Sequence, residues 1–148
     1  MRDSFNYPEA VAQVFDDKDL NYEKFDKDDE TLFAIPMPAK NAPGLKVFLH
    51  VTEIGDCKIR AYIVREVSES KFPAILEAIN RLNGKYRYVT LSIDSDGDVL
   101  AAYDFTLFGE DPEVIEQTVM HMLILVSKVM DNCIKPLMKI IWFDDEED

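Results

Sequence analysis

Residues 92–103 read SIDSDGDVLAAY, and this stretch decides how the second half of the chain folds. Three aspartates crowd around one glycine, which fits a calcium loop, a catalytic carboxylate pair or the tip of a hairpin. An EF-hand loop requires glycine at its sixth position and a glutamate at its twelfth. Counted from Asp94, Gly97 stands fourth and Phe105 stands twelfth, and the flanking residues alternate as strands do. The pattern therefore does not fit an EF-hand.

The same residues fit a tight β-hairpin. Asp94 begins a type I turn, and Gly97 takes the left-handed position that follows it. The expected partners on one apolar face are Ile93 with Val99, Leu91 with Ala101, and Val89 with Tyr103. Loop length and apolar pattern agree, which favours a structural role for the acids. A weak cation site at Asp94, Asp96 and Asp98 remains the alternative.

A helix is predicted before this hairpin, whose strands span about residues 86–94 and 98–107. Pro73 opens the helix, because a proline costs no hydrogen bond in the first turn. Gly84 is expected to close it as a left-handed residue.

A longer helix is predicted after the hairpin. Asp111 caps it, and an apolar face continues to about Asn132. Pro136 then stops or kinks the helix, and residues 137–143 are expected to form a further short helix.

The middle of the chain contains a second hairpin, with alternating runs at residues 45–53 and 57–65. Around a loop at residues 54–56, the expected core pairs are Val51 with Ile59, Leu49 with Ala61, and Val47 with Ile63. The opposite face then pairs Thr52 with Lys58, His50 with Arg60, and Phe48 with Tyr62. A slip of one residue would place apolar side chains against charged ones, so the faces are well determined.

The N-terminal part is expected to begin with a helix over residues 7–17 that Asn6 caps. Short strands follow at about 22–25 and 31–37, and Pro36 restricts the second to an edge or to its own end. The element order is helix, three or four strands, helix, two strands, helix. This order predicts an α+β fold, an antiparallel sheet with helices packed on it.

Charge and composition narrow the class of protein. The chain has 148 residues and a net charge of −13, and residues 16–30 and 144–148 together account for −10 of that charge. Phosphate backbones and anionic lipids would be repelled, so neither nucleic acid nor membrane is expected as a partner. The acids either keep the protein soluble or dock on a basic partner. A single domain over 1–143 with an acidic tail at 144–148 is predicted.

The sequence carries little sign of catalysis. It contains no P-loop, no GxGxxG and no GxSxG, and His50 and His121 have no zinc-ligand spacing. Cys57 and Cys133 are expected to be separate, reduced, buried thiols. No signal segment is recognised, and the apolar run VMHMLILV is too short to span a membrane. We expect a cytoplasmic protein that is not an enzyme and needs no cofactor.

Apolar residues left over on the non-core face of the sheet suggest a binding surface. The candidate partner-binding residues are Phe48, His50, Arg60, Tyr62, Leu100 and Ala102. They are expected to form an apolar strip to which a strand or helix of a partner can bind. The alternative is that a further helix, such as residues 137–143, covers this face.

Two segments carry a resemblance to a known family. They read FPAILEAINRLNGKYRYVTLSIDSDGDVLAAYDF (72–105) and DPEVIEQTVMHMLILVSKVM (111–130). A proline-initiated helix, the pair Asn80 and Asn83, an Asp-Gly turn between two strands and a long last helix follow one another as in the YbjN family. The chain resembles this bacterial family, whose fold is similar to that of type III secretion chaperones.

The resemblance implies a protein-interaction or chaperone-like regulatory module linked to sensory transduction. Such folds bind extended segments of other proteins or form dimers, so we expect an unidentified protein partner and a homodimer. No catalytic residues carry over. The alternative function is a small metal-responsive protein or enzyme that uses the turn at Asp94–Asp98.

Overall fold

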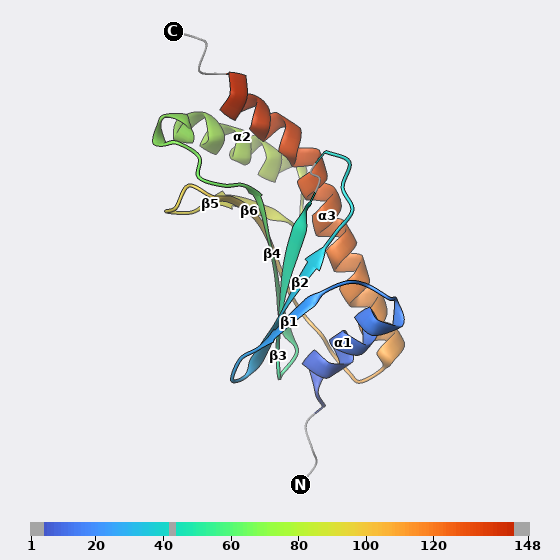
Figure 1. The fold of residues 1–148 in the computed structure, drawn as a ribbon. Helices are drawn as coiled ribbons and strands as arrows, with labels where there is room; N and C mark the ends of the chain where they lie inside the picture. The colour runs from blue at the N-terminus through green and yellow to red at the C-terminus, as the bar shows by residue number, and fades with distance from the viewer. Residues whose placement is uncertain (1–4, 42–43, 144–148) are drawn as a thin grey trace.

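The computed structural model describes residues 5–41 and 44–143, and it consists of one antiparallel sheet with helices on one side (Figure 1). The six strands stand in the order β1-β2-β3-β4-β6-β5. The elements are α1 (Tyr7–Asp17), β1 (Glu23–Asp26), β2 (Glu30–Pro36), β3 (Lys46–Thr52), β4 (Asp56–Val64), a 3₁₀ turn (Glu69–Lys71), α2 (Phe72–Lys85), β5 (Thr90–Ile93), β6 (Val99–Thr106) and α3 (Pro112–Phe143). The predicted α+β fold class is confirmed. The predicted tail at 144–148 lies outside the described residues.

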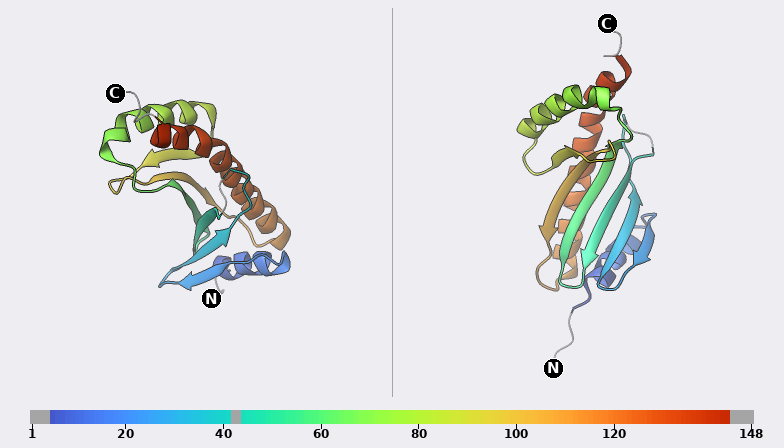
Figure 2. Two further views of the ribbon diagram at one scale, coloured as in Figure 1. Left: turned by 45° about the horizontal axis from the view of Figure 1, so that its top comes forward. Right: turned by 90° about the vertical axis from the view of Figure 1, so that its left-hand side faces the viewer.

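All three helices pack on the same face of the sheet. The long helix α3 lies across β4 and β6, α1 packs against one end of α3, and α2 packs against β5 and the other end of α3. Alternate residues of the strands point into this core, among them Val47, Leu49 and Ile59, which are fully buried. The right-hand view of Figure 2 looks onto the opposite face, which no described helix covers. We call this surface the open face.

The turn at Asp94–Gly97 has the predicted geometry. Gly97 has a φ of +83°, and its N–H donates to the carbonyl oxygen of Asp94 at 3.0 Å. Ile93 lies opposite Val99 and Leu91 opposite Ala101, as the sequence pattern predicts. The paired strand begins at Thr90, so the expected partners Val89 and Tyr103 lie beyond its last pair.

The first hairpin has a different register from the predicted one. Leu49 lies opposite Ile59, whereas the prediction placed Val51 there. The loop is Glu53–Gly55 and not 54–56, because Gly55 has a φ of +94° and must stand last in the loop. Its N–H donates to the carbonyl oxygen of Thr52 at 3.0 Å.

The observed pairs in this hairpin replace those predicted. They are Val47–Ala61, Phe48–Arg60, Leu49–Ile59, His50–Lys58 and Val51–Cys57. The shift is two residues, so every side chain stays on the face predicted for it.

Two predicted helix ends are wrong. Helix α2 continues through Gly84 to Lys85 with no left-handed residue at the glycine, and the N–H of Tyr86 donates to the carbonyl oxygen of Leu82. The predicted end of the last helix at about Asn132 and the separate helix over 137–143 are wrong, because α3 continues through Pro136 to Phe143. Of the two predicted effects of Pro136, the structure has the kink and not the stop (Figure 2).

The proline in α3 is tolerated because tertiary packing outweighs its local cost. Cys133 and Leu137, on either side of Pro136, are fully buried and hold both halves of the helix against the core. Proline removes the hydrogen bond to the carbonyl of Asn132, which is exposed and therefore accessible to water. Figure 2 shows α3 changing direction in its last third.

One outer edge of the sheet is occupied by a side chain. Asn83 of α2 accepts from the N–H of Leu91 at 2.7 Å and donates to its carbonyl oxygen at 3.0 Å. The Asn83 side chain thus makes the two backbone hydrogen bonds at Leu91 that a further strand would otherwise make.

We predict that Gly97→Ala destabilises the protein by about 2–4 kcal/mol. A Cβ at this left-handed position would lie 2.8 Å from the carbonyl oxygen of Val67. Gly84→Ala is the matched control: nothing lies within 4 Å of its Cβ, and a helical glycine replaced by alanine stabilises by up to about 1 kcal/mol. Urea unfolding followed by circular dichroism measures both. Equal effects of the two substitutions would contradict the assigned turn.

We predict a loss of stability above pH 9 that comes from the two cysteines. Burial raises the pKa of the Cys57 thiol to about 12 and that of Cys133 to about 11, from an ordinary value of 9.0. Up to pH 9 both states keep the thiol protons. Above it only the unfolded chain releases them, so the free energy of unfolding falls as pH rises towards 11. Urea titrations from pH 8 to 11 should show a shallower fall in a Cys57→Ala, Cys133→Ala variant. Identical slopes would contradict the burial of these thiols.

Candidate functional site

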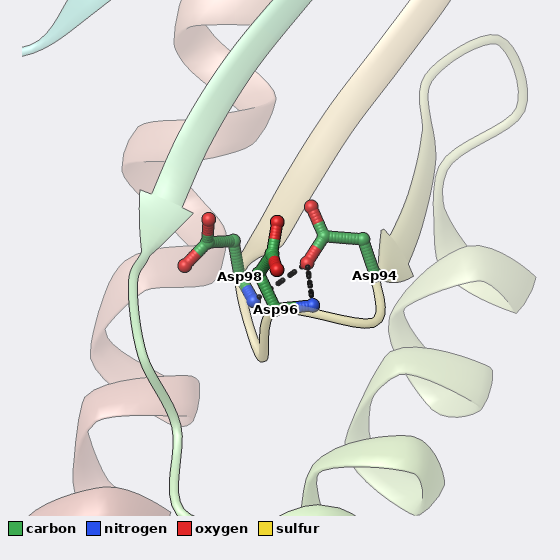
Figure 3. A group of neighbouring side chains, drawn as sticks. All are labelled: Asp94, Asp96 and Asp98. Atoms are coloured by element: carbon green, nitrogen blue, oxygen red, sulfur yellow. Dashed lines mark hydrogen bonds between the residues drawn. The ribbon is translucent and has the colours of Figure 1, made fainter.

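The acidic turn was the first candidate site, and the structure brings its three carboxylates together (Figure 3). One oxygen from each of Asp94, Asp96 and Asp98 lies within 4.8 Å of the others. Asp94 accepts hydrogen bonds from the backbone N–H of Asp96 at 2.9 Å and of Asp98 at 3.0 Å. These bonds close the turn, so the position of Asp94 follows from backbone geometry.

Asp98 fastens the linker between β4 and α2. It is 8% exposed, and its carboxylate accepts from the N–H of Glu66 at 2.8 Å. Glu66 has a left-handed φ of +55°, and the N–H of Val67 donates to the carbonyl oxygen of Gly97 at 2.8 Å. The turn therefore orders the segment that carries the chain from the sheet to α2. These hydrogen bonds give a structural role to Asp94 and Asp98, two of the three acids in the turn.

The open face of the sheet is the stronger candidate. All six predicted residues lie on it, and each is half-buried. Phe48 stands opposite Arg60, which stands opposite Ala102, and Tyr62 stands opposite Leu100. The aromatic rings of Phe48 and Tyr62 meet on the diagonal, with centroids 6.3 Å apart and planes at 75°. Strands β3, β4 and β6 thus contribute to one continuous apolar band.

The band also contains residues that the sequence analysis did not select. Leu32 and Ala34 of β2 stand opposite His50 and Phe48, and Phe25 of the edge strand β1 stands opposite Leu32. A signal for two of them was present: the run LFAI in β2 is apolar at successive positions, which is typical of a strand buried on both faces. We call Phe25, Leu32, Ala34, Phe48, Tyr62, Leu100 and Ala102 the open-face strip. Ala34 is 3% exposed, so the other six residues provide its accessible surface.

Two polar side chains within the band, Arg60 and His50, have partners in the chain. The Arg60 guanidinium donates to the Asp104 carboxylate at 2.6 Å, and His50 Nδ1 lies 3.1 Å from a Glu30 carboxylate oxygen. His50 lies opposite Lys58 and not opposite Arg60 as predicted, because of the register shift described above. Arg60 and His50 therefore have their polar partners within one copy of the chain.

The alternative hypothesis, that a helix over residues 137–143 covers the open-face strip, is wrong. Residues 137–143 belong to α3, which packs on the opposite face. Helix α3 approaches the strip at one end, where Ile134 and Met138 line a groove together with Phe48 and Tyr62. Within the described residues, no helix has the length and apolarity needed to cross a membrane.

Two solved structures share this fold. The first, titled "Crystal structure of YbjN, a putative transcription regulator from E. coli", has a TM-score of 0.58 and 15% identity over 84% of this chain and 88% of that chain. The second comes from "Structure of the heterodimeric complex ExoU-SpcU from the type III secretion system (T3SS) of Pseudomonas aeruginosa". It has a TM-score of 0.53 and 11% identity over 89% of this chain and 98% of that chain. The predicted type III secretion chaperone-like fold is confirmed.

A search of curated protein sequences found no match to the chain. The sequence does match one family model. The model for YbjN, described as "Putative bacterial sensory transduction regulator", matches residues 7–135, which include every element from α1 to most of α3. This match agrees with the resemblance carried by residues 72–105 and 111–130, and the chain belongs to the YbjN family.

Proposed function

We propose that the protein is a non-enzymatic, cytoplasmic protein-interaction module of the YbjN type that binds a protein partner, or a second copy of itself, through the open-face strip. One observation carries this proposal: a continuous apolar band crosses a sheet face that no described helix covers. Contiguous exposed apolar surface of this kind marks interaction sites in soluble proteins.

The composition of the strip supports binding to a protein. Phe48 and Tyr62 are rigid aromatic anchors, and aromatic side chains contribute disproportionately to interface energy. The ion pair of Arg60 with Asp104 and the contact of His50 with the Glu30 carboxylate already form within one copy of the chain. A partner that covers the strip would bury these charges in pairs, which avoids the large cost of an unpaired buried charge.

Further support comes from the similar structures and from the thiols. The ExoU–SpcU structure is titled a heterodimeric complex, so a fold of this kind is compatible with holding a second chain. The two cysteines have a raised pKa and are buried, which makes them poor nucleophiles and supports a role other than catalysis.

We predict that the double substitution Phe48→Ser, Tyr62→Ser weakens association about 30-fold while the protein stays folded. Each aromatic anchor contributes about 1 kcal/mol or more at an interface. Multi-angle light scattering across protein concentrations measures self-association, and affinity capture with the partner measures hetero-association. The matched control is Ile54→Ser, Phe108→Ser, whose side chains are 75% and 77% exposed outside the strip. Unchanged association of a folded Phe48→Ser, Tyr62→Ser protein would remove the strip as the binding surface.

We also predict a position-dependent crosslink. A photoreactive benzoylphenylalanine introduced at Tyr62 should form a covalent adduct on irradiation in cells, because a bound chain would lie against this ring. The same residue at Phe108 should form none. A product of twice the chain mass identifies a second copy, and any other mass identifies a different partner. Equal adducts at both positions would argue against a specific surface.

A further inference from the structure

Three hollows on the described surface differ in the charges of their lining residues. One of about 600 Å³ near the β1–β2 turn is lined by six acids and two lysines. A second of about 660 Å³, between α1 and the start of α3, is lined by Glu9, Asp17, Glu113 and Glu116 and by no lysine or arginine. The third, of about 640 Å³, has Lys46 and Arg65 as its charged lining residues. This third hollow, which we call the corner groove, is thus the cationic one of the three.

The corner groove lies where the open-face strip meets α3. Phe48 and Tyr62 form its strip side, and Ile134 and Met138 form its helix side. Asn41, at the edge of the groove, is held by Asp131, whose carboxylate accepts from the N–H of Asn41 at 2.7 Å. The groove thus combines two aromatic rings with the β-branched Ile134 and the flexible Met138.

Lys46 and Arg65 are held in position by neighbouring side chains, but their hydrogen-bond donors are not all used. The guanidinium carbon of Arg65 lies 4.0 Å from the centroid of the Tyr62 ring, and this stacking orients the group. Its nearest carboxylate oxygen, on Asp98, is 3.9 Å away. Lys46 Nζ is 3.7 Å from a carboxylate oxygen of Glu23. Both cations are about half exposed, so the remaining donors are open to a ligand.

We propose that the corner groove selects partner segments in which an aromatic or aliphatic side chain is flanked by carboxylates. The inference rests on the proposed function and names the kind of partner that the strip takes. The apolar side chain enters between Tyr62 and Met138, and the acids bind Lys46 and Arg65. A chain of net charge −13 repels such a segment over most of its surface, so the groove sets both the place and the register of docking.

The test uses a fluorescein-labelled nonapeptide that contains one tryptophan and one leucine between glutamates, and the full-length protein. Fluorescence anisotropy at about 50 mM and about 300 mM salt measures affinity, because attraction between exposed charges is screened at the higher salt. The comparison peptide has lysines in place of the glutamates. The test variant is Lys46→Gln, Arg65→Gln. The control is Lys58→Gln, which removes a cation from the open face outside the groove.

We expect the acidic peptide to bind more tightly than the basic one and to lose affinity at the higher salt. The Lys46→Gln, Arg65→Gln variant should bind it about tenfold more weakly at low salt, and Lys58→Gln less than about twofold. Urea unfolding should show that both variants are folded. Absence of acidic-peptide binding, equal binding of the basic peptide, or unchanged affinity in the double variant would overturn the inference. If partner association still depends on Phe48 and Tyr62 in that case, the proposed function stands and the inference alone fails.

Discussion

Two left-handed glycines fix the registers of the two hairpins at the centre of the sheet. Gly55 ends the loop at Glu53–Gly55 and Gly97 ends the turn at Asp94–Gly97, and each has a φ that other residues adopt only at a cost. Once these positions are set, each hairpin has one register, and β4 of the first hairpin pairs with β6 of the second at the centre of the sheet. The open-face strip crosses both hairpins, from Phe48 and Tyr62 to Leu100 and Ala102. The surface that we propose for binding therefore depends on backbone conformation at two turns.

The parts of the fold that local physics dictates were predictable from sequence. Helix α1 begins at its Asn6 cap, and the turn at Asp94–Gly97 follows from glycine chemistry. Interior helix positions were harder. Glycine and proline are common helix-ending residues, yet α2 continues one residue past Gly84 and α3 continues through Pro136. At Pro136, buried neighbours such as Leu137 stabilise the continued helix more than the proline destabilises it. Tertiary packing of this kind cannot be read from a single sequence.

Part of the candidate site was likewise predictable from the sequence, and part was not. Alternation within β3, β4 and β6 correctly placed the six predicted residues on one face, since a register error of two leaves the faces unchanged. It did not identify Phe25, Leu32 and Ala34, because they reach the strip through the pairing of β1 with β2 and of β2 with β3. The corner groove was beyond prediction for another reason. It joins Arg65 to Met138, which are brought together only by the path of α3.

The amide of Asn83 has a consequence for how the molecule behaves at high concentration. Exposed strand edges are templates on which other chains can nucleate fibrous aggregates. By bonding both backbone groups of Leu91, Asn83 removes the central docking point of the β5 edge. The opposite edge, β1, is four residues long and carries Glu23, Lys24 and Asp26, which discourage stacking of like chains. The molecule thus leaves one broad apolar face available for recognition while both ends of its sheet resist uncontrolled polymerisation.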